Sequence, residues 1–171
     1  MIRTMAVVLL AVATAGTPIG DAGMSVSLAI PSRDGVRRVS VGSPAHDFHV
    51  LVRNIAATPQ KIWDATFSWG YYALSFEVVG QDGSVSIIRK RETAFTRNVP
   101  GTWTVDPGQS FVFDVYLGDR TVWDGVPIPG PSCKDMRLRA IYTVSPDEES
   151  KKLAVWTGRV SSATESILLC Q

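Results

Sequence analysis

The chain has 171 residues, with 17 basic and 16 acidic side chains and a formal net charge of +1 at pH 7. This balance disfavours nucleic-acid binding, which requires a basic surface, and it disfavours electrostatic attachment to an anionic membrane. Two histidines and two cysteines leave few side chains for a metal site or for a histidine-dependent catalytic centre.

Residues 1–15 have the pattern of a secretory leader. Arg3 supplies a positive start, Met5–Ala15 is apolar and uncharged, and Ala13-Thr14-Ala15 matches the small-x-small pattern of a signal-peptidase site. We therefore expect a signal peptide at residues 1–15 and a single domain at residues 16–171. The leader is too short to anchor in a bilayer, and no second apolar segment is long enough. We thus expect no integral membrane span after cleavage, and a secreted or periplasmic location.

The rest of the chain is predicted to consist of strands, because short β-rich runs alternate with turns of Gly, Pro, Asn and Asp. Met24–Ile30 alternates apolar and polar residues, as a half-buried strand does, and Val36–Val41 follows a turn at residues 32–35. Asp47–Asn54 alternates in the same way. Its expected inward-facing residues are Phe48, Val50 and Val52.

The aromatic middle of the chain leads into a predicted β-hairpin. Ser75–Val79 and Val85–Ile88 flank Gln81-Asp82-Gly83. An Asp-Gly turn between β-rich runs is a strong hairpin signal, because glycine adopts positive φ without strain. The basic run Arg89-Lys90-Arg91 that follows is interpreted as a solvated edge that discourages strand addition, not as a binding patch.

Two later segments show the clearest alternation. Ser110–Leu117 and Lys134–Val144 each place apolar residues at nearly every second position. Between them, residues 118–131 contain prolines that forbid regular strand pairing. Residues 145–150 are predicted to turn the chain back into a run over residues 153–160. Together, these segments predict an all-β fold, an immunoglobulin-like antiparallel β-sandwich of about 8–9 strands without helices.

Cys133 and Cys170 are predicted to form a disulfide, as a lone cysteine pair in an oxidising compartment commonly does. If the runs on either side of the turn pair as a hairpin centred near Lys151, the two cysteines arrive opposite each other, because both are about equally distant from that centre. A bulge at Gly158 would shift this register. The chain has no Cys-x-x-Cys motif, which gives no support to a thioredoxin-type or zinc-ribbon site.

The sequence contains no recognisable catalytic or cofactor motif. His46, Asp47 and His49 form a His-Asp-x-His cluster, but residues three apart on a strand point to opposite faces, so we expect no metal site. A Gly-x-Ser-x-Gly elbow and phosphate-binding motifs are absent, and no carboxylate pair is marked for glycoside hydrolysis. We therefore expect no catalytic residues, no cofactor and no enzymatic activity.

Five tryptophans are the remaining functional signal. Tryptophan stacks on sugars and anchors protein interfaces, but it also fills the core of a sandwich. Trp69 and Trp156 stand beside or within predicted strands and are assigned to the core. Trp103 and Trp123 have Gly, Pro and Asp close by in the sequence, so they are predicted to lie in surface loops and are the candidate ligand-binding residues.

Six segments within roughly residues 47–162 carry a resemblance to known domains. They are Leu51-Val52-Arg53-Asn54, Ser68-Trp69-Gly70-Tyr71-Tyr72, Arg97-Asn98-Val99-Pro100, Pro107-Gly108-Gln109-Ser110-Phe111, Leu138-Arg139-Ala140-Ile141-Tyr142 and Trp156-Thr157-Gly158. They resemble a group of uncharacterised secreted bacterial domains. That resemblance implies an immunoglobulin-like fold and brings no assigned activity.

A looser likeness rests on a strand that ends at an Asn, the hairpin at Asp82-Gly83, Phe95 and the Pro107-Gly108 turn. This layout is similar to the BsuPI-type proteinase-inhibitor domain, which implies protease inhibition. That inhibitor type is intracellular, whereas this chain is expected to be exported.

The sequence thus predicts a secreted or envelope-associated, non-catalytic binding or accessory domain whose partner is an envelope or extracellular protein or a glycan. The main alternative is a proteinase inhibitor that presents an exposed loop, such as Arg89–Val105 or Asp119–Ser132, to a protease. An enzyme of unrecognised type is the third hypothesis. A sandwich fold does not decide between these classes, because it hosts many unrelated functions.

Overall fold

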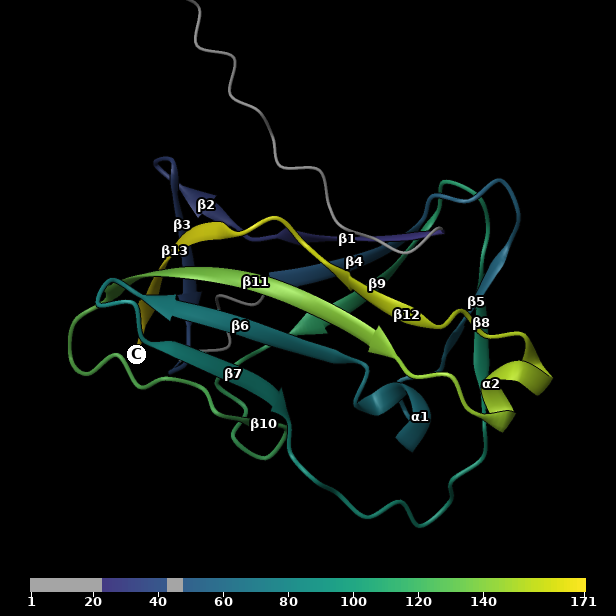
Figure 1. The fold of residues 1–171 in the computed structure, drawn as a ribbon. Helices are drawn as coiled ribbons and strands as arrows, with labels where there is room; N and C mark the ends of the chain where they lie inside the picture. The colour runs from purple at the N-terminus through teal and green to yellow at the C-terminus, as the bar shows by residue number, and fades with distance from the viewer. Residues whose placement is uncertain (1–22, 43–47) are drawn as a thin grey trace, which may run out of the picture.

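The structure is a computed structural model that describes residues 23–42 and 48–171 (Figure 1). The expected signal peptide, and the pair His46 and Asp47, lie outside the described residues. The elements in chain order are β1 (Met24–Ala29), β2 (Ser32–Arg33), β3 (Val36–Ser40), β4 (Phe48–Asn54), β5 (Gln60–Trp63), α1 (Ser68–Tyr71), β6 (Leu74–Gly80), β7 (Val85–Lys90), β8 (Thr102–Val105), β9 (Ser110–Val115), β10 (Trp123–Asp124), β11 (Lys134–Val144), α2 (Glu148–Leu153), β12 (Gly158–Ser161) and β13 (Glu165–Cys170).

The strands form two main sheets that pack face to face. The smaller sheet has the order β1-β4-β9, and the larger has the order β10-β7-β6-β11-β13-β3-β2, with β12 also paired to β11. Phe48 of β4 meets Phe76 of β6 edge-on, with 5.6 Å between the ring centroids. Phe113 of β9 lies 5.9 Å from Tyr142 of β11. The core therefore lies between the two sheets, as in a β-sandwich.

The strand order is that of an immunoglobulin-like domain. β1-β4-β9 corresponds to strands A-B-E, and β7-β6-β11-β13 corresponds to C′-C-F-G. The predicted all-β sandwich is confirmed, but the predicted strand number is too low. The additional strands include β2 and β10, which are only two residues long, and the short pair β5-β8. β3 pairs with β13 in parallel, so the larger sheet is not purely antiparallel.

The alternation predicted for the central strands is confirmed. β11 has the predicted bounds, and β4 buries every second side chain. The three inward residues of β4 are fully buried; they are Phe48, Val50 and Val52. The predicted Asp-Gly hairpin is also present, because Val79 pairs with Val85 and Gly83 adopts a φ of 80° between them.

The expectation of a chain without helices is wrong. α2 occupies part of the segment that was predicted to be a simple turn, and it begins with a capping box. The Asp147 carboxylate accepts a hydrogen bond from the Ser150 backbone N–H, and the Ser150 hydroxyl oxygen accepts one from the Asp147 N–H. These two bonds satisfy N–H groups that a helix start leaves unpaired, which makes one short helix favourable here. Within the described part of the chain, no helix is long and apolar enough to cross a membrane.

The predicted disulfide is present between Cys133 and Cys170. Lys134 pairs with Leu169 across β11 and β13, which places the two cysteines directly opposite each other with 4.2 Å between their Cα atoms. The hairpin prediction therefore gave the correct partner and the correct register. The bond joins neighbouring strands of one sheet near the C-terminus of the chain.

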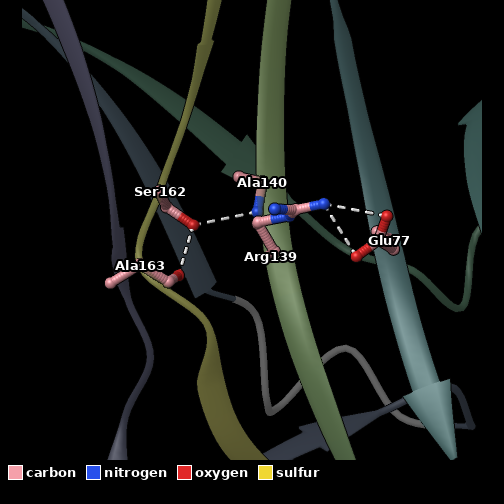
Figure 2. Close-up of polar contacts among 5 residues, drawn as sticks. All are labelled: Glu77, Arg139, Ala140, Ser162 and Ala163. Atoms are coloured by element: carbon pink, nitrogen blue, oxygen red, sulfur yellow. Dashed lines mark hydrogen bonds and ion pairs between the residues drawn. The ribbon is translucent and has the colours of Figure 1, made fainter. Parts of the chain in front are cut away.

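The segment that pairs with β11 after α2 is interrupted at Ser162, between β12 and β13, and not at Gly158. Gly158 pairs with Val144 in β12, and the register changes by one residue between β12 and β13. Figure 2 shows how Ser162 bridges the gap, since its hydroxyl accepts a hydrogen bond from the Ala140 N–H and donates one to the Ala163 carbonyl. The Ser162 hydroxyl therefore takes the place of a backbone acceptor for the Ala140 N–H. The extra residue is accommodated without displacing the cysteines.

Replacing Tyr142 with Phe is expected to leave the free energy of unfolding unchanged within about 1 kcal/mol, or to raise it slightly. The Tyr142 side chain is fully buried, and its hydroxyl has no hydrogen-bond partner in the structure described. Burial also raises the pKa of this hydroxyl. Urea denaturation of Tyr142→Phe beside Tyr142→Ala, which is expected to lose about 3–5 kcal/mol, checks the assignment. A loss above about 1.5 kcal/mol in the Phe variant would mean that the hydroxyl has a bonded partner.

Candidate functional site

A groove of about 400 Å³ lies on the outer face of the larger sheet, away from the core. It is bounded by the β2–β3 turn and by residues of β6, β11 and β13. Val36, Val79 and Leu168 contribute apolar side chains, and Asp135 and Arg137 contribute charged ones. We refer to this site as the outer-face groove.

The strand register places one row of side chains along this groove. Val79 pairs with Val85 of β7 and with Arg137 of β11, and Arg137 pairs with Ser166 of β13. Residues opposite each other in neighbouring strands point to the same face. The row therefore runs from an apolar end over β7 and β6 to a polar end over β11 and β13.

The apolar end of the row is exposed. Val85 is 59% exposed, and Ile87, two residues further along β7, is 50% exposed. A single exposed apolar residue on a protein surface needs no explanation, but adjacent exposed residues beside a concave site are typical of interaction surfaces. The sequence did contain this signal, because Val78-Val79 and Ile87-Ile88 are consecutive apolar pairs on paired strands. One member of each pair must face outward.

The charged groups around the groove differ in how they are paired. Arg139 donates through Nη2 to both carboxylate oxygens of Glu77, at 2.9 Å each (Figure 2). Asp135 accepts a hydrogen bond from the Gln81 side chain. Arg137, in contrast, is exposed and has no ionic or hydrogen-bonded side-chain partner among residues 23–42 and 48–171. Its guanidinium is available to a carboxylate of a bound partner.

The two candidate tryptophans have different outcomes. Trp103 is 51% exposed, as predicted, although it lies on β8 and not in a loop. Its nearest ring neighbour is Phe111, at 6.3 Å between centroids. A ligand contact by Trp103 stays a prediction.

The surface position predicted for Trp123 is wrong. Trp123 is only 3% exposed and packs against Phe76 of the core, with 5.3 Å between ring centroids. Its backbone pairs with Lys90 of β7, which turns the indole inward. The prediction relied on nearby Gly, Pro and Asp residues, which mark turns but do not determine the direction of a side chain. For the two tryptophans assigned to the core, Trp156 is buried and Trp69 is partly buried against the core.

The interpretation of Arg89-Lys90-Arg91 as a solvated edge is only partly correct, because Lys90 is half-buried. Its Nζ lies 4.1 Å from the centroid of Trp123 and 5.0 Å from that of Tyr71. Burial lowers the pKa of Lys90, and the nearby Asp119 carboxylate partly opposes that shift. Lys90 therefore packs by a cation–π contact where β10 covers the end of β7.

His49 contacts a carboxylate on the opposite side of the molecule. Its Nδ1 lies 2.8 Å from Oδ1 of Asp114, which is directly across from it in the register of β4 and β9. Both side chains are exposed. No group of three or more potential metal ligands is found among the described residues. His46, which the sequence predicts to diverge from His49, lies outside the described residues.

The connection between β7 and β8 is an exposed loop that is braced on α1. The Ser68 backbone N–H donates to Oδ1 of Asn98, and the Asn98 amide donates to the Ser68 hydroxyl. The Phe95 ring packs edge-on against Tyr71. Arg97 lies between these two anchors, is exposed, and has no side-chain partner within the described residues.

Comparison with models of known protein families matches none of them, and comparison with curated proteins finds no relative.

Proposed function

We propose that this protein is an exported, non-catalytic binding domain that holds a protein partner against the outer-face groove. The observation that carries the proposal is the row in which exposed Val85 and the apolar Val79 side chain lie beside Arg137, whose guanidinium has no partner among the described residues. Apolar contact supplies affinity at such a surface, and a charged group at its rim supplies orientation and specificity.

A protein partner is favoured over a glycan by the chemistry of the lining. Sugars stack on exposed aromatic rings, whereas none of the described residues that line the groove is aromatic. Trp103 is exposed on β8, which does not contribute to the groove. A glycan bound at Trp103 is therefore a separate hypothesis, and the quenching of tryptophan fluorescence by added sugar in wild type but not in Trp103→Ala would support it.

The exported location is part of the proposal. The leader pattern at residues 1–15 and the Cys133–Cys170 disulfide both support a secreted or periplasmic protein. A protein partner would then be a component of the cell envelope or of the extracellular medium.

Arg137→Glu is expected to weaken partner binding about tenfold or more, because it reverses the charge at the polar end of the groove. The experiment is affinity capture from envelope and extracellular fractions of the native host, followed by titration of the captured protein. Arg53→Glu is the matched control, since Arg53 is an exposed arginine of β4 on the smaller sheet. A captured protein whose affinity is equal for wild type and Arg137→Glu would contradict the proposed site.

Inhibition of a trypsin-like protease is a second candidate function, and the braced loop is the observation that favours it. Protease inhibition requires an exposed residue held in a rigid loop, and Arg97 is exposed between the anchored residues Phe95 and Asn98. An arginine fits the acidic specificity pocket of trypsin-like enzymes. The second predicted loop, residues 119–132, contains the buried Trp123 and Val126 and fits this role less well.

The inhibitor hypothesis predicts that the protein lowers the activity of a trypsin-like protease on a chromogenic peptide. Arg97→Lys should retain inhibition and Arg97→Ala should abolish it, because only the former supplies a cation to the specificity pocket. Undiminished protease activity in excess wild-type protein, or rapid cleavage after Arg97, would exclude the hypothesis.

A further inference from the structure

β9 is the last strand of the smaller sheet, and its outer side is unpaired among residues 23–42 and 48–171. The sheet ends there in the order β1-β4-β9, and none of the described elements pairs with β9 on the side away from β4. An unpaired strand edge carries a row of free N–H and C=O groups that can pair with another chain.

The register identifies which groups of β9 are free. The Asn54 N–H donates to the Gln109 carbonyl, so these two residues form a hydrogen-bonded pair at the end of the ladder between β4 and β9. In an antiparallel ladder, hydrogen-bonded and non-hydrogen-bonded pairs alternate, so every second pair from Gln109 onward is hydrogen-bonded. Phe111, Phe113 and Val115 therefore direct their backbone groups toward β4. Ser110, Val112 and Asp114 direct theirs away from it, and no described residue bonds to them there.

β9 has few of the features that usually protect an edge. The segment Ser110–Val115 contains no proline, lysine or bulge, and Val112 at its centre is 49% exposed. The inward-facing Phe111 and Phe113 are only partly buried, whereas the equivalent residues of the adjacent β4 are fully buried. The open side of β9 therefore leaves part of the core accessible to solvent.

We propose that two copies of this chain pair their β9 strands in antiparallel orientation about a two-fold axis at Val112. In this register Val112 meets the same residue of the second copy, and Ser110 lies opposite Asp114 of the second copy. All three residues are those whose backbone groups point outward, so each opposed pair can form the hydrogen bonds of a regular antiparallel ladder. The two three-stranded sheets would become one six-stranded sheet.

The side chains favour a second copy over an unrelated strand, because β9 is complementary to itself. Antiparallel pairing places side chains of equal register on the same face. Valine meets valine on the axis, and the serine hydroxyl can donate to the aspartate carboxylate beside it. No like charges are opposed, and an isologous contact of this kind closes as a dimer without further growth. This inference is independent of the outer-face groove, which lies on the other sheet.

Sedimentation velocity of the protein purified after export, over a concentration series that reaches the millimolar range, tests the proposal. Wild type should dimerise. Val112→Pro should be monomeric, because it removes the outward N–H without removing a bond to β4. Val112→Lys should also be monomeric, because it places two cations on the axis. Val112→Thr is the matched control and should remain dimeric, since it retains the N–H and the β-branched shape. Far-UV and near-UV circular dichroism establish that every variant is folded.

Three outcomes would overturn the proposal. The first is a wild-type protein that stays monomeric over the whole series. The second is a dimer that persists in folded Val112→Pro and Val112→Lys, which would place the contact at another surface. A monomer that instead binds an unrelated extended peptide at β9, detected as protection of the Val112 amide from hydrogen exchange, would also reject the second copy as the occupant.

Discussion

Replacing both cysteines with serine is expected to lower the free energy of unfolding by about 3–4 kcal/mol. The disulfide joins positions 37 residues apart, and this separation sets the chain entropy that the unfolded state loses. It also holds β13 against β11 at the end of the sheet, where β3 pairs in parallel. Urea denaturation of Cys133→Ser/Cys170→Ser measures the loss.

Reduction of the wild-type protein supplies the control for this prediction. Wild type in reducing buffer should match the double serine variant, because both lack the same covalent link. A double variant as stable as the oxidised wild type would show that the sheet pairing alone fixes the C-terminal strand.

Replacing Asn54 with Ala is expected to destabilise the protein by about 3 kcal/mol, because several hydrogen bonds of a fully buried side chain are lost together. The Asn54 amide donates to the carbonyls of Thr58 and Val105, each at 2.8 Å from Nδ2, and its side-chain oxygen accepts from the Ala56 N–H. These bonds connect the end of β4 to β8 and to the loop that follows β4. The alanine variant leaves three backbone groups without their side-chain partner.

The matched control is Asn98→Ala, which removes an exposed asparagine that bonds to Ser68. Its expected loss is below about 1 kcal/mol, because water replaces the lost partners at an exposed site. Equal losses for the two alanine variants in urea denaturation would contradict the structural role assigned to Asn54.

Much of the fold could be predicted from local patterns, because one buried face imposes a period of two on each strand. β4 and β11 agree with their predicted alternation. The Cys133–Cys170 pairing also followed from counting residues from the turn near Lys151. That count succeeded because the extra residue at Ser162 lies inside the hairpin and changes the register by only one.

Features that depend on tertiary position could not be predicted. The buried position of Trp123 follows from its pairing with Lys90, which joins segments far apart in the sequence. α2 was missed because a capping box of Asp147 and Ser150 within a short polar segment with a proline looks like a turn. Both errors arise where local composition indicates a turn but long-range contacts or a single cap decide the structure.

The candidate site was largely invisible in the sequence. Val79, Arg137 and Ser166 come from strands that are separated by long stretches of chain, and only the register places them in one row. The available signal was the pair of consecutive apolar residues on each of β6 and β7. Such pairs indicate an outward apolar side chain, but they do not indicate which other residues lie beside it.

Site-specific photo-crosslinking tests the proposed binding function most directly. A photoreactive amino acid replaces Ser166, an exposed residue that lines the outer-face groove, and crosslinking is carried out in the native host. The control carries the same amino acid at Ser27, an exposed residue of β1 on the smaller sheet. The proposal predicts one discrete protein adduct at Ser166, absent at Ser27 and strongly reduced by Arg137→Glu. Equal adducts at both positions, or none at Ser166 in a folded and exported protein, would contradict it.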